Sequence, residues 1–238
     1  MSSHSYGARP LVAEAIGTAM LLAAVVGSGI MGEQLAGGNI AIALLANTIA
    51  TGAALVALIL MFGGVSGAHF NPAVTIASAS RGGLAWHLVP GYVAAQLAGA
   101  WGGVLAAHLM FNQPLFMLST HARSGPAQMF SEFVATFGLL SVIWGCSRSR
   151  PESVPFAVAA YITSAYWFTA STSFANPAVT LARALTDTFA GIRPQDVPGF
   201  VLAQILGATA ATLLFRWLVP AVPAITARVV QSHTEALS

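Results

Sequence analysis

The chain has 238 residues, of which 56% are hydrophobic and 7% are Asp, Glu, Lys or Arg. Soluble domains contain about 25% charged residues, so this composition excludes a disordered chain, a nucleic-acid-binding domain and nearly every soluble enzyme. The formal net charge is +2, the chain has one cysteine, Cys146, and its six histidines show no metal-binding spacing, so no internal disulfide, metal site or cofactor is expected.

Six apolar stretches are long enough to cross a lipid bilayer. A hydrocarbon core of about 30 Å requires about 20 apolar residues in a helix. In chain order, the predicted spans are 10–31, 40–62, 87–111, 127–146, 154–172 and 197–219. The first is interpreted as a retained span rather than a signal peptide, because Glu14 lies inside its apolar run. We therefore expect an all-α membrane protein with six transmembrane helices.

Two of the connecting segments carry Asn-Pro at the start of a further, shorter apolar stretch, 71–80 and 176–185. Asn is a favoured N-cap and Pro is favoured at the first helical position, so each stretch is predicted to be a helix. Ten residues make about 15 Å of helix, which is half a bilayer. Non-helical backbone at membrane depth is tolerated where it lines a water-filled path, so two re-entrant half-helices predict a polar pathway.

The chain also repeats itself. Three segments recur in the same order: 70–75 as 175–180, 89–100 as 197–208 and, more loosely, 13–18 as 131–136. Each copy, 10–111 and 127–219, holds three spans, so the second copy must enter the membrane from the opposite side. We therefore expect one channel domain, 1–238, built as an inverted repeat whose half-helices meet near the midplane.

The arginines predict the orientation of this domain in the membrane. With a cytoplasmic N-terminus, six arginines fall inside and three outside, which the positive-inside rule favours. We therefore expect a multi-pass protein of the inner (plasma) membrane with both termini in the cytoplasm.

The predicted meeting point of the half-helices has a chemistry of its own. Each helix N-terminus carries about half a positive charge from its dipole. Asn71 and Asn176 cap these ends, and their NH₂ groups can donate hydrogen bonds to a passing oxygen. Neutral hydroxylated solutes and water should pass such a site, whereas cations should be repelled.

These motifs resemble the aquaporin and aquaglyceroporin family. The resemblance rests on the repeat and on the two Asn-Pro-Ala boxes, formed by Asn71, Pro72, Ala73 and by Asn176, Pro177, Ala178. It implies a homotetramer in which each protomer has its own pore in the lipid bilayer. It also implies that Glu14 and Glu132, together with His69, support the re-entrant loops; the alternative is that the two carboxylates form a proton relay.

One position departs from the family's usual pattern. Val179 directly follows the second box, where members commonly have an arginine that narrows the pore, and Arg183, four residues further on, is not expected to replace it. Spacing from the two asparagines adds Thr51, Ser164 and Ser173 to the selectivity filter. The filter should therefore be wide, uncharged and mildly polar. A valine at this place resembles the branch of bacterial aquaglyceroporins associated with arsenic resistance, and this resemblance implies passage of neutral arsenite, a trihydroxy solute similar to glycerol.

The sequence thus predicts a passive channel for small neutral hydroxylated solutes: arsenite-type metalloid hydroxides, glycerol and water. Three alternatives remain open at this stage. The chain could be a generic glycerol and water facilitator, an ion-coupled secondary transporter with inverted repeats, or a non-conducting structural membrane protein.

Overall fold

The computed structural model describes residues 7–218, and every regular element in that part of the chain is helical. The six long helices are α1 (Arg9–Leu35), α2 (Ile40–Ser66), α4 (Val89–Met110), α5 (Pro126–Ser149), α6 (Val154–Phe168) and α8 (Val197–Leu218). Two short helices, α3 (Pro72–Ser80) and α7 (Pro177–Arg183), lie in the connections that carry Asn-Pro. Single turns of 3-10 helix, Trp86–Leu88, Pro151–Ser153 and Pro194–Asp196, precede α4, α6 and α8.

The observed helix ends differ from the predicted ones at several places. The first two helices each run four residues beyond their predicted ends, whereas α7 stops at Arg183, two residues early. In contrast, α6 ends four residues early, at Phe168 rather than at 172, because the backbone of Thr169 is extended and Thr172 has a left-handed φ of 60°. The end of the last predicted span, 219, lies outside the described residues.

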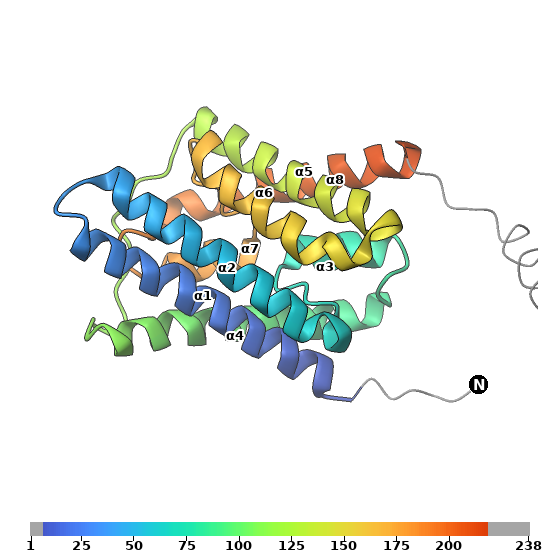
Figure 1. Cartoon of the computed structure of the whole chain (residues 1–238), viewed down its shortest axis with the longest axis horizontal. Helices are drawn as coiled ribbons and strands as arrows, with labels where there is room; N and C mark the ends of the chain where they lie inside the picture. Colours follow the sequence, from blue (N-terminus) through green and yellow to red (C-terminus); the bar gives the residue numbers. More distant parts are fainter. Residues whose placement is uncertain (1–6, 219–238) are drawn as a thin grey trace, which may run out of the picture.

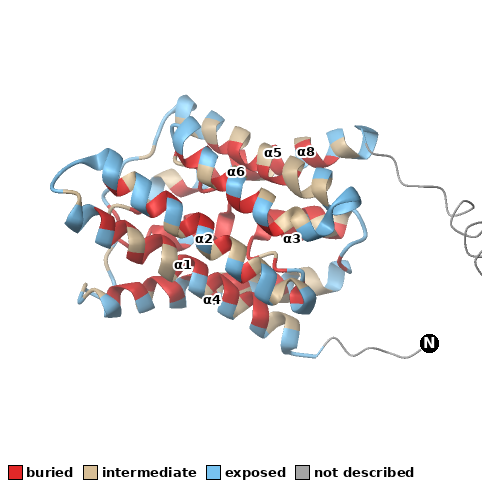
Figure 2. Ribbon diagram, viewed as in Figure 1, coloured by how far each residue is buried: buried red, intermediate tan, exposed pale blue. Residues whose placement is uncertain are grey.

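Among the described helices, five are long and apolar enough to cross a membrane by length and composition alone. The sixth, α6, has only 15 residues, but a 3-10 turn continues it at its N-terminal end. Large apolar side chains are exposed on all six long helices, including Ile16, Ile49, Leu109, Phe130, Phe156 and Leu202 (Figure 2). A soluble protein rarely exposes so much apolar surface, so these outer faces belong against lipid, and the protein is a membrane protein.

The end of α2 redirects the chain into the interior. Gly67 caps this helix with a φ of 86°, a left-handed conformation that residues with a side chain rarely adopt, and its N–H donates to the carbonyl of Gly63 at 3.1 Å. The chain then turns back and starts α3 only five residues later.

Glycines allow two pairs of long helices to approach closely. A Cβ atom at Gly99 of α4 would lie 2.1 Å from the carbonyl oxygen of Ala15 in α1, and one at Gly103 would lie 2.2 Å from that of Ala19. In the other half, a Cβ atom at Gly207 of α8 would lie 2.4 Å from the carbonyl oxygen of Phe133 in α5. The α1–α4 and α5–α8 contacts are therefore backbone to backbone.

The two short helices lie end to end inside the ring of long helices (Figure 1). In this view α3 occupies one half of the molecule and α7 the other, and the described ends of the chain lie on the α3 side. The N-termini of both short helices therefore point at the centre of the molecule.

Candidate functional site

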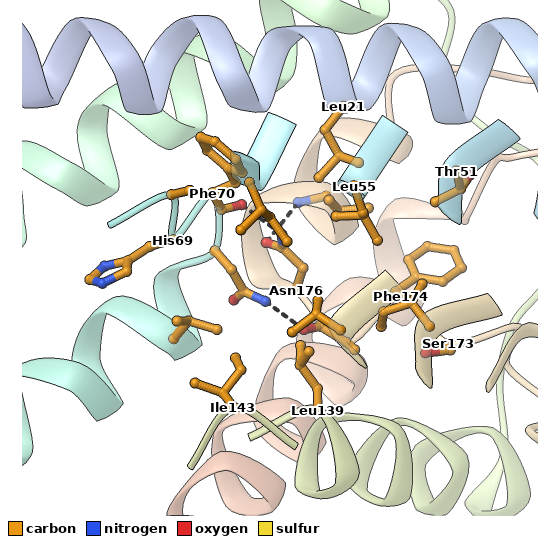
Figure 3. A pocket seen from close by; sticks show the side chains of 18 of the residues that line it. Leu21, Thr51, Leu55, His69, Phe70, Leu139, Ile143, Ser173, Phe174 and Asn176 are labelled. Carbon is orange, nitrogen blue, oxygen red and sulfur yellow. Dashed lines mark hydrogen bonds between the residues drawn. The ribbon is translucent and has the colours of Figure 1, made fainter. Parts of the chain in front are cut away.

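A cavity of about 260 Å³ lies along the molecular centre, lined by both half-helices and by the inner faces of α1, α2, α5 and α6 (Figure 3). The side chains that α6 contributes recur at every fourth residue: Val154, Val158, Ile162 and Tyr166. Twelve residues separate the first from the last, so the cavity follows about 18 Å of helix. We call its end beside Ser78 and Ser147 the α3 mouth, and its end beside Thr51 and Tyr166 the α7 mouth.

The two asparagines meet at the middle of this cavity. The side-chain oxygen of Asn71 accepts from the N–H of Ala73 at 2.9 Å, and that of Asn176 accepts from the N–H of Ala178 at 2.9 Å. Each NH₂ group reaches across to the other half: Asn71 Nδ2 donates to the carbonyl of Ala175 and Asn176 Nδ2 to that of Phe70, both at 2.8 Å (Figure 3). One hydrogen of each NH₂ group is used in this way, and the second remains available to a solute.

Glu14 supports the loop that leads into α3. Its carboxylate accepts from the backbone N–H groups of His69 and Phe70, at 2.9 and 2.7 Å, and from the hydroxyl of Ser66 at 2.6 Å. Gln96 Nε2 donates to the same carboxylate at 2.7 Å. These contacts hold a loop in which Ala68 and Phe70 both have a left-handed φ of 48°.

Glu132 supports the loop that leads into α7 in the same way. Its two oxygens accept from the N–H groups of Phe174 and Ala175, each at 2.8 Å, and Gln204 Nε2 donates to it at 2.6 Å. This loop repeats the strained backbone, since Ser173 and Ala175 have φ values of 51° and 48°. The carboxylate oxygens are occupied by N–H donors, which is the arrangement of a structural support.

Four further polar residues in these networks were missed by the sequence reasoning. Gln96 Nε2 also donates to Thr75 Oγ1 at 2.9 Å, and Gln204 Nε2 donates to Thr180 Oγ1 at 2.8 Å. All four are fully buried. The repeat in the sequence could have identified them, because each glutamine and each threonine recurs at the matching position of the other copy.

His69 lies near the α3 mouth, where its side chain lines the cavity. Its Nδ1 is 3.1 Å from Thr75 Oγ1, and its ring centroid is 5.6 Å from that of Tyr92. The structure thus brings His69 together with Glu14 through its backbone N–H.

Three of the four residues predicted for the filter line the cavity: Thr51, Ser173 and Val179. Ser164 does not, which corrects the assignment made from spacing. Its side chain is exposed and donates to the carbonyl of Tyr161 in its own helix. It lies two residues from both Ile162 and Tyr166, so it faces away from the cavity.

Tyr166 takes the place predicted for Ser164. Its hydroxyl lies 3.4 Å from Thr51 Oγ1, so the two side chains meet across the α7 mouth. Arg183 also lines this mouth and is 2% exposed. Tyr166 therefore makes this mouth bulkier, and Arg183 makes it more polar, than the sequence alone predicted.

Hydrogen bonds hold the connection between α4 and α5 beside the α7 mouth. The N–H and hydroxyl of Thr120 donate to Asp187 at 2.7 and 2.9 Å, and these two bonds hold the pKa of that carboxyl below its ordinary value. Arg193 N–H donates to the carbonyl of His121 at 2.8 Å.

Comparison with known proteins agrees with this geometry. The family model for the major intrinsic protein family matches residues 1–155 and 147–238. The chain is 57% identical to aquaglyceroporin AqpS of Rhizobium meliloti (strain 1021) over 218 residues, which are 91% of this chain and 93% of the relative. It is 31% identical to aquaporin NIP1-3 of Oryza sativa subsp. japonica over 215 residues, 87% of this chain and 74% of the relative.

A solved structure has the same fold. The X-ray structure of the aquaglyceroporin from Plasmodium falciparum matches with a TM-score of 0.68, covering 89% of this chain and 96% of its own. The two sequences are 22% identical, so this likeness establishes the architecture.

Proposed function

Because the chain belongs to the major intrinsic protein family, whose aquaglyceroporins are channels and not enzymes, we propose that it conducts small neutral hydroxylated solutes passively across a membrane. The observation that carries this proposal is the central cavity, which passes both half-helix N-termini and follows about 18 Å of α6. In it, Asn71 and Asn176 present NH₂ donors that hydroxyl oxygens accept.

The proposed solutes are arsenite-type metalloid hydroxides and glycerol, together with water. Val179 supports this choice, because valine leaves room and offers no donor where the resembled family commonly has an arginine. The hydroxyls of Thr51, Ser173 and Tyr166 give the same mouth a mildly polar lining that suits a trihydroxy solute.

We further propose that the channel is a homotetramer of single-domain protomers in the inner membrane, each built from the repeats 10–111 and 127–219. Both termini are then cytoplasmic, and the α3 mouth opens to the same side, because the described chain ends lie on that side (Figure 1).

Flux measurements on purified protein test the proposed function. Proteoliposomes are mixed with an osmotic excess of glycerol, urea or arsenite, and light scattering follows the re-swelling of the vesicles. We expect solute entry well above that of protein-free vesicles, with water entry in the same preparation. Absence of any solute entry by well-folded protein would contradict the proposal.

The same vesicles separate a channel from an ion-coupled transporter. A channel equilibrates the solute with or without a proton or sodium gradient, whereas a transporter concentrates it and stops when the gradient is dissipated. The structure favours the channel, because N–H donors occupy both buried carboxylates, Glu14 and Glu132.

A further inference from the structure

Arg183 is the last residue of α7 and lies one helical turn beyond Val179. Two turns of helix separate it from Asn176, so its Cα lies about 10 Å from the central asparagine, toward the α7 mouth. It lines the same cavity as Val179, Ser173 and Tyr166, although 98% of its surface is buried by protein (2% exposed).

The guanidinium of Arg183 is held in one place. Its Nε donates to the carbonyl of Ala190, and its central carbon lies 3.4 Å from the ring centroid of Phe174. Arg123 also lies over this ring, at 5.0 Å, and Phe200 packs edge-on against it. The charge therefore cannot swing away from the mouth without breaking these contacts.

Two nitrogens of this guanidinium remain available. Within the described residues, neither Nη1 nor Nη2 of Arg183 makes a hydrogen bond, and neither the His121–Asp187 nor the Arg193–Asp196 ion pair involves it. Arginine stays protonated and offers five N–H donors, so a fixed positive charge with free donors faces the cavity.

A second polar group at the same mouth is also unpartnered. Ser173 is 3% exposed, lines the cavity and has a left-handed φ of 51°. Its Oγ has no hydrogen-bond partner within the described residues. A buried hydroxyl without a partner is rare unless a ligand or water completes it. Ser173 precedes Phe174, the residue on which the guanidinium of Arg183 rests.

We propose that Arg183 is the charged selectivity residue of this channel, placed one turn further along α7 than the position held by Val179. This inference rests on the proposed channel function. The charge repels cations at the α7 mouth, so the pore needs no arginine at its narrowest point to exclude them. The free N–H groups, together with Ser173 Oγ, bind a hydroxyl oxygen of the neutral solute before it reaches the asparagines.

A positive charge at Arg183 allows the filter at Val179 to be wider and the pore still to exclude cations. A valine after the second Asn-Pro-Ala box leaves the filter wider than an arginine would, and a wider filter without a charge would leak small cations. Moving the positive charge one turn outward keeps the electrostatic barrier and removes the side chain from the constriction.

The test compares cation leak with solute flux in proteoliposomes. The variants are Arg183→Met, which removes the charge, Arg183→Lys, which keeps it, and Arg193→Met, which removes a charge that is paired with Asp196 and lies outside the cavity. A fluorescent dye reports proton and potassium leak, and light scattering reports glycerol entry. We expect Arg183→Met to raise cation leak by about tenfold or more, with Arg183→Lys and Arg193→Met close to the wild type.

A charge-relocation variant makes the comparison stricter. In Val179→Arg combined with Arg183→Met, the positive charge returns to the mouth one turn deeper, so cation leak should fall again while glycerol entry drops. Ser173→Asp leaves Arg183 and its contacts in place but cancels its charge, so it should raise cation leak even if Arg183→Met does not fold. Ser173→Asn serves as its neutral control.

The possible results separate the two proposals. If the wild type admits no glycerol, the channel function is wrong. The role of Arg183 is wrong if the wild type admits glycerol but the Arg183→Met and Ser173→Asp variants, both well folded, show no more cation leak than the wild type. If Arg193→Met leaks as much as Arg183→Met, the effect is a general surface charge, and the role of Arg183 is again wrong.

Discussion

At the scale of single residues, we propose that Val179 helps to set the free width of the α7 mouth. It is 5% exposed and faces the cavity beside Ser173. Val179→Arg adds a long side chain there, so permeability to glycerol and arsenite should fall by about tenfold relative to water, equivalent to about 1.4 kcal/mol of barrier. Stopped-flow scattering of the same vesicles measures all three solutes.

Val179→Leu is the matched control for this variant, because it adds bulk without a donor or a charge. It should reduce the permeability to glycerol and arsenite only slightly. Equal losses for glycerol, arsenite and water in folded Val179→Arg would show that this position does not select by size.

Tyr166 is the other residue that narrows this mouth, through its approach to Thr51 at 3.4 Å. Tyr166→Ala removes the ring, so entry of glycerol and urea should rise relative to water. Ser164→Ala, two residues away on the exposed face of the same helix, should leave all permeabilities unchanged. A stronger effect at Ser164 than at Tyr166 would return the filter to the position predicted from spacing.

Sequence alone could identify the residues that the repeat marks twice. Asn71 and Asn176, and Glu14 and Glu132, occupy matching positions, and the structure brings each pair to equivalent contacts. Ser164 was misplaced because counting back from Asn176 assumes a fixed helix and loop length. The inward turn of Arg183 depends on Phe174 and Ala190, which no local pattern connects to it.

At the scale of elements, one carboxylate from a long helix accepts backbone hydrogen bonds from the loop that leads into each half-helix. Glu14→Gln places an NH₂ group where the N–H groups of His69 and Phe70 need acceptors. Each buried donor left without an acceptor costs about 1–3 kcal/mol. Thermal unfolding in detergent should therefore shift to a lower temperature, and glycerol entry should fall.

Glu33→Gln is the matched control, since Glu33 lies on the same helix but is exposed. It should unfold at the wild-type temperature. If Glu14→Gln instead keeps its stability and only loses a dependence of flux on a proton gradient, the carboxylate is a proton carrier and the support role is wrong.

Element positions followed well from the sequence, because apolar runs and Asn-Pro caps act locally. Both half-helices begin at the residue after their predicted asparagine cap. The end of α6 did not follow, since Thr169 and Thr172 are compatible with an apolar helix. The chain leaves the helix there to reach Glu132 with the N–H groups of Phe174 and Ala175.

At the scale of the whole molecule, the close approach of α1 and α4 depends on glycine. Gly99→Ala places a methyl group 2.1 Å from the carbonyl oxygen of Ala15, so the helices must separate, at a cost of about 1–3 kcal/mol. Gly102→Ala, on the exposed side of α4 with no atom within 4 Å, is the control. It should be neutral or stabilising, because alanine favours a helix.

Melting temperatures of the two variants, measured side by side, test this difference. Equal melting temperatures would mean that α1 and α4 can separate without loss of stability. Only the structure identifies Ala15, Ala19 and Phe133 as the residues that Gly99, Gly103 and Gly207 approach.

The reciprocal bonds of the asparagines also bear on how the chain is made. Asn71 and its acceptor Ala175 are 104 residues apart, and Asn176 and its acceptor Phe70 are 106 apart. During synthesis the first half enters the membrane before either bond can form, so its re-entrant loop reaches its final contacts only after the second half has been inserted. Formation of the midplane is therefore a late step of biogenesis, and a chain truncated before residue 175 has no route to it.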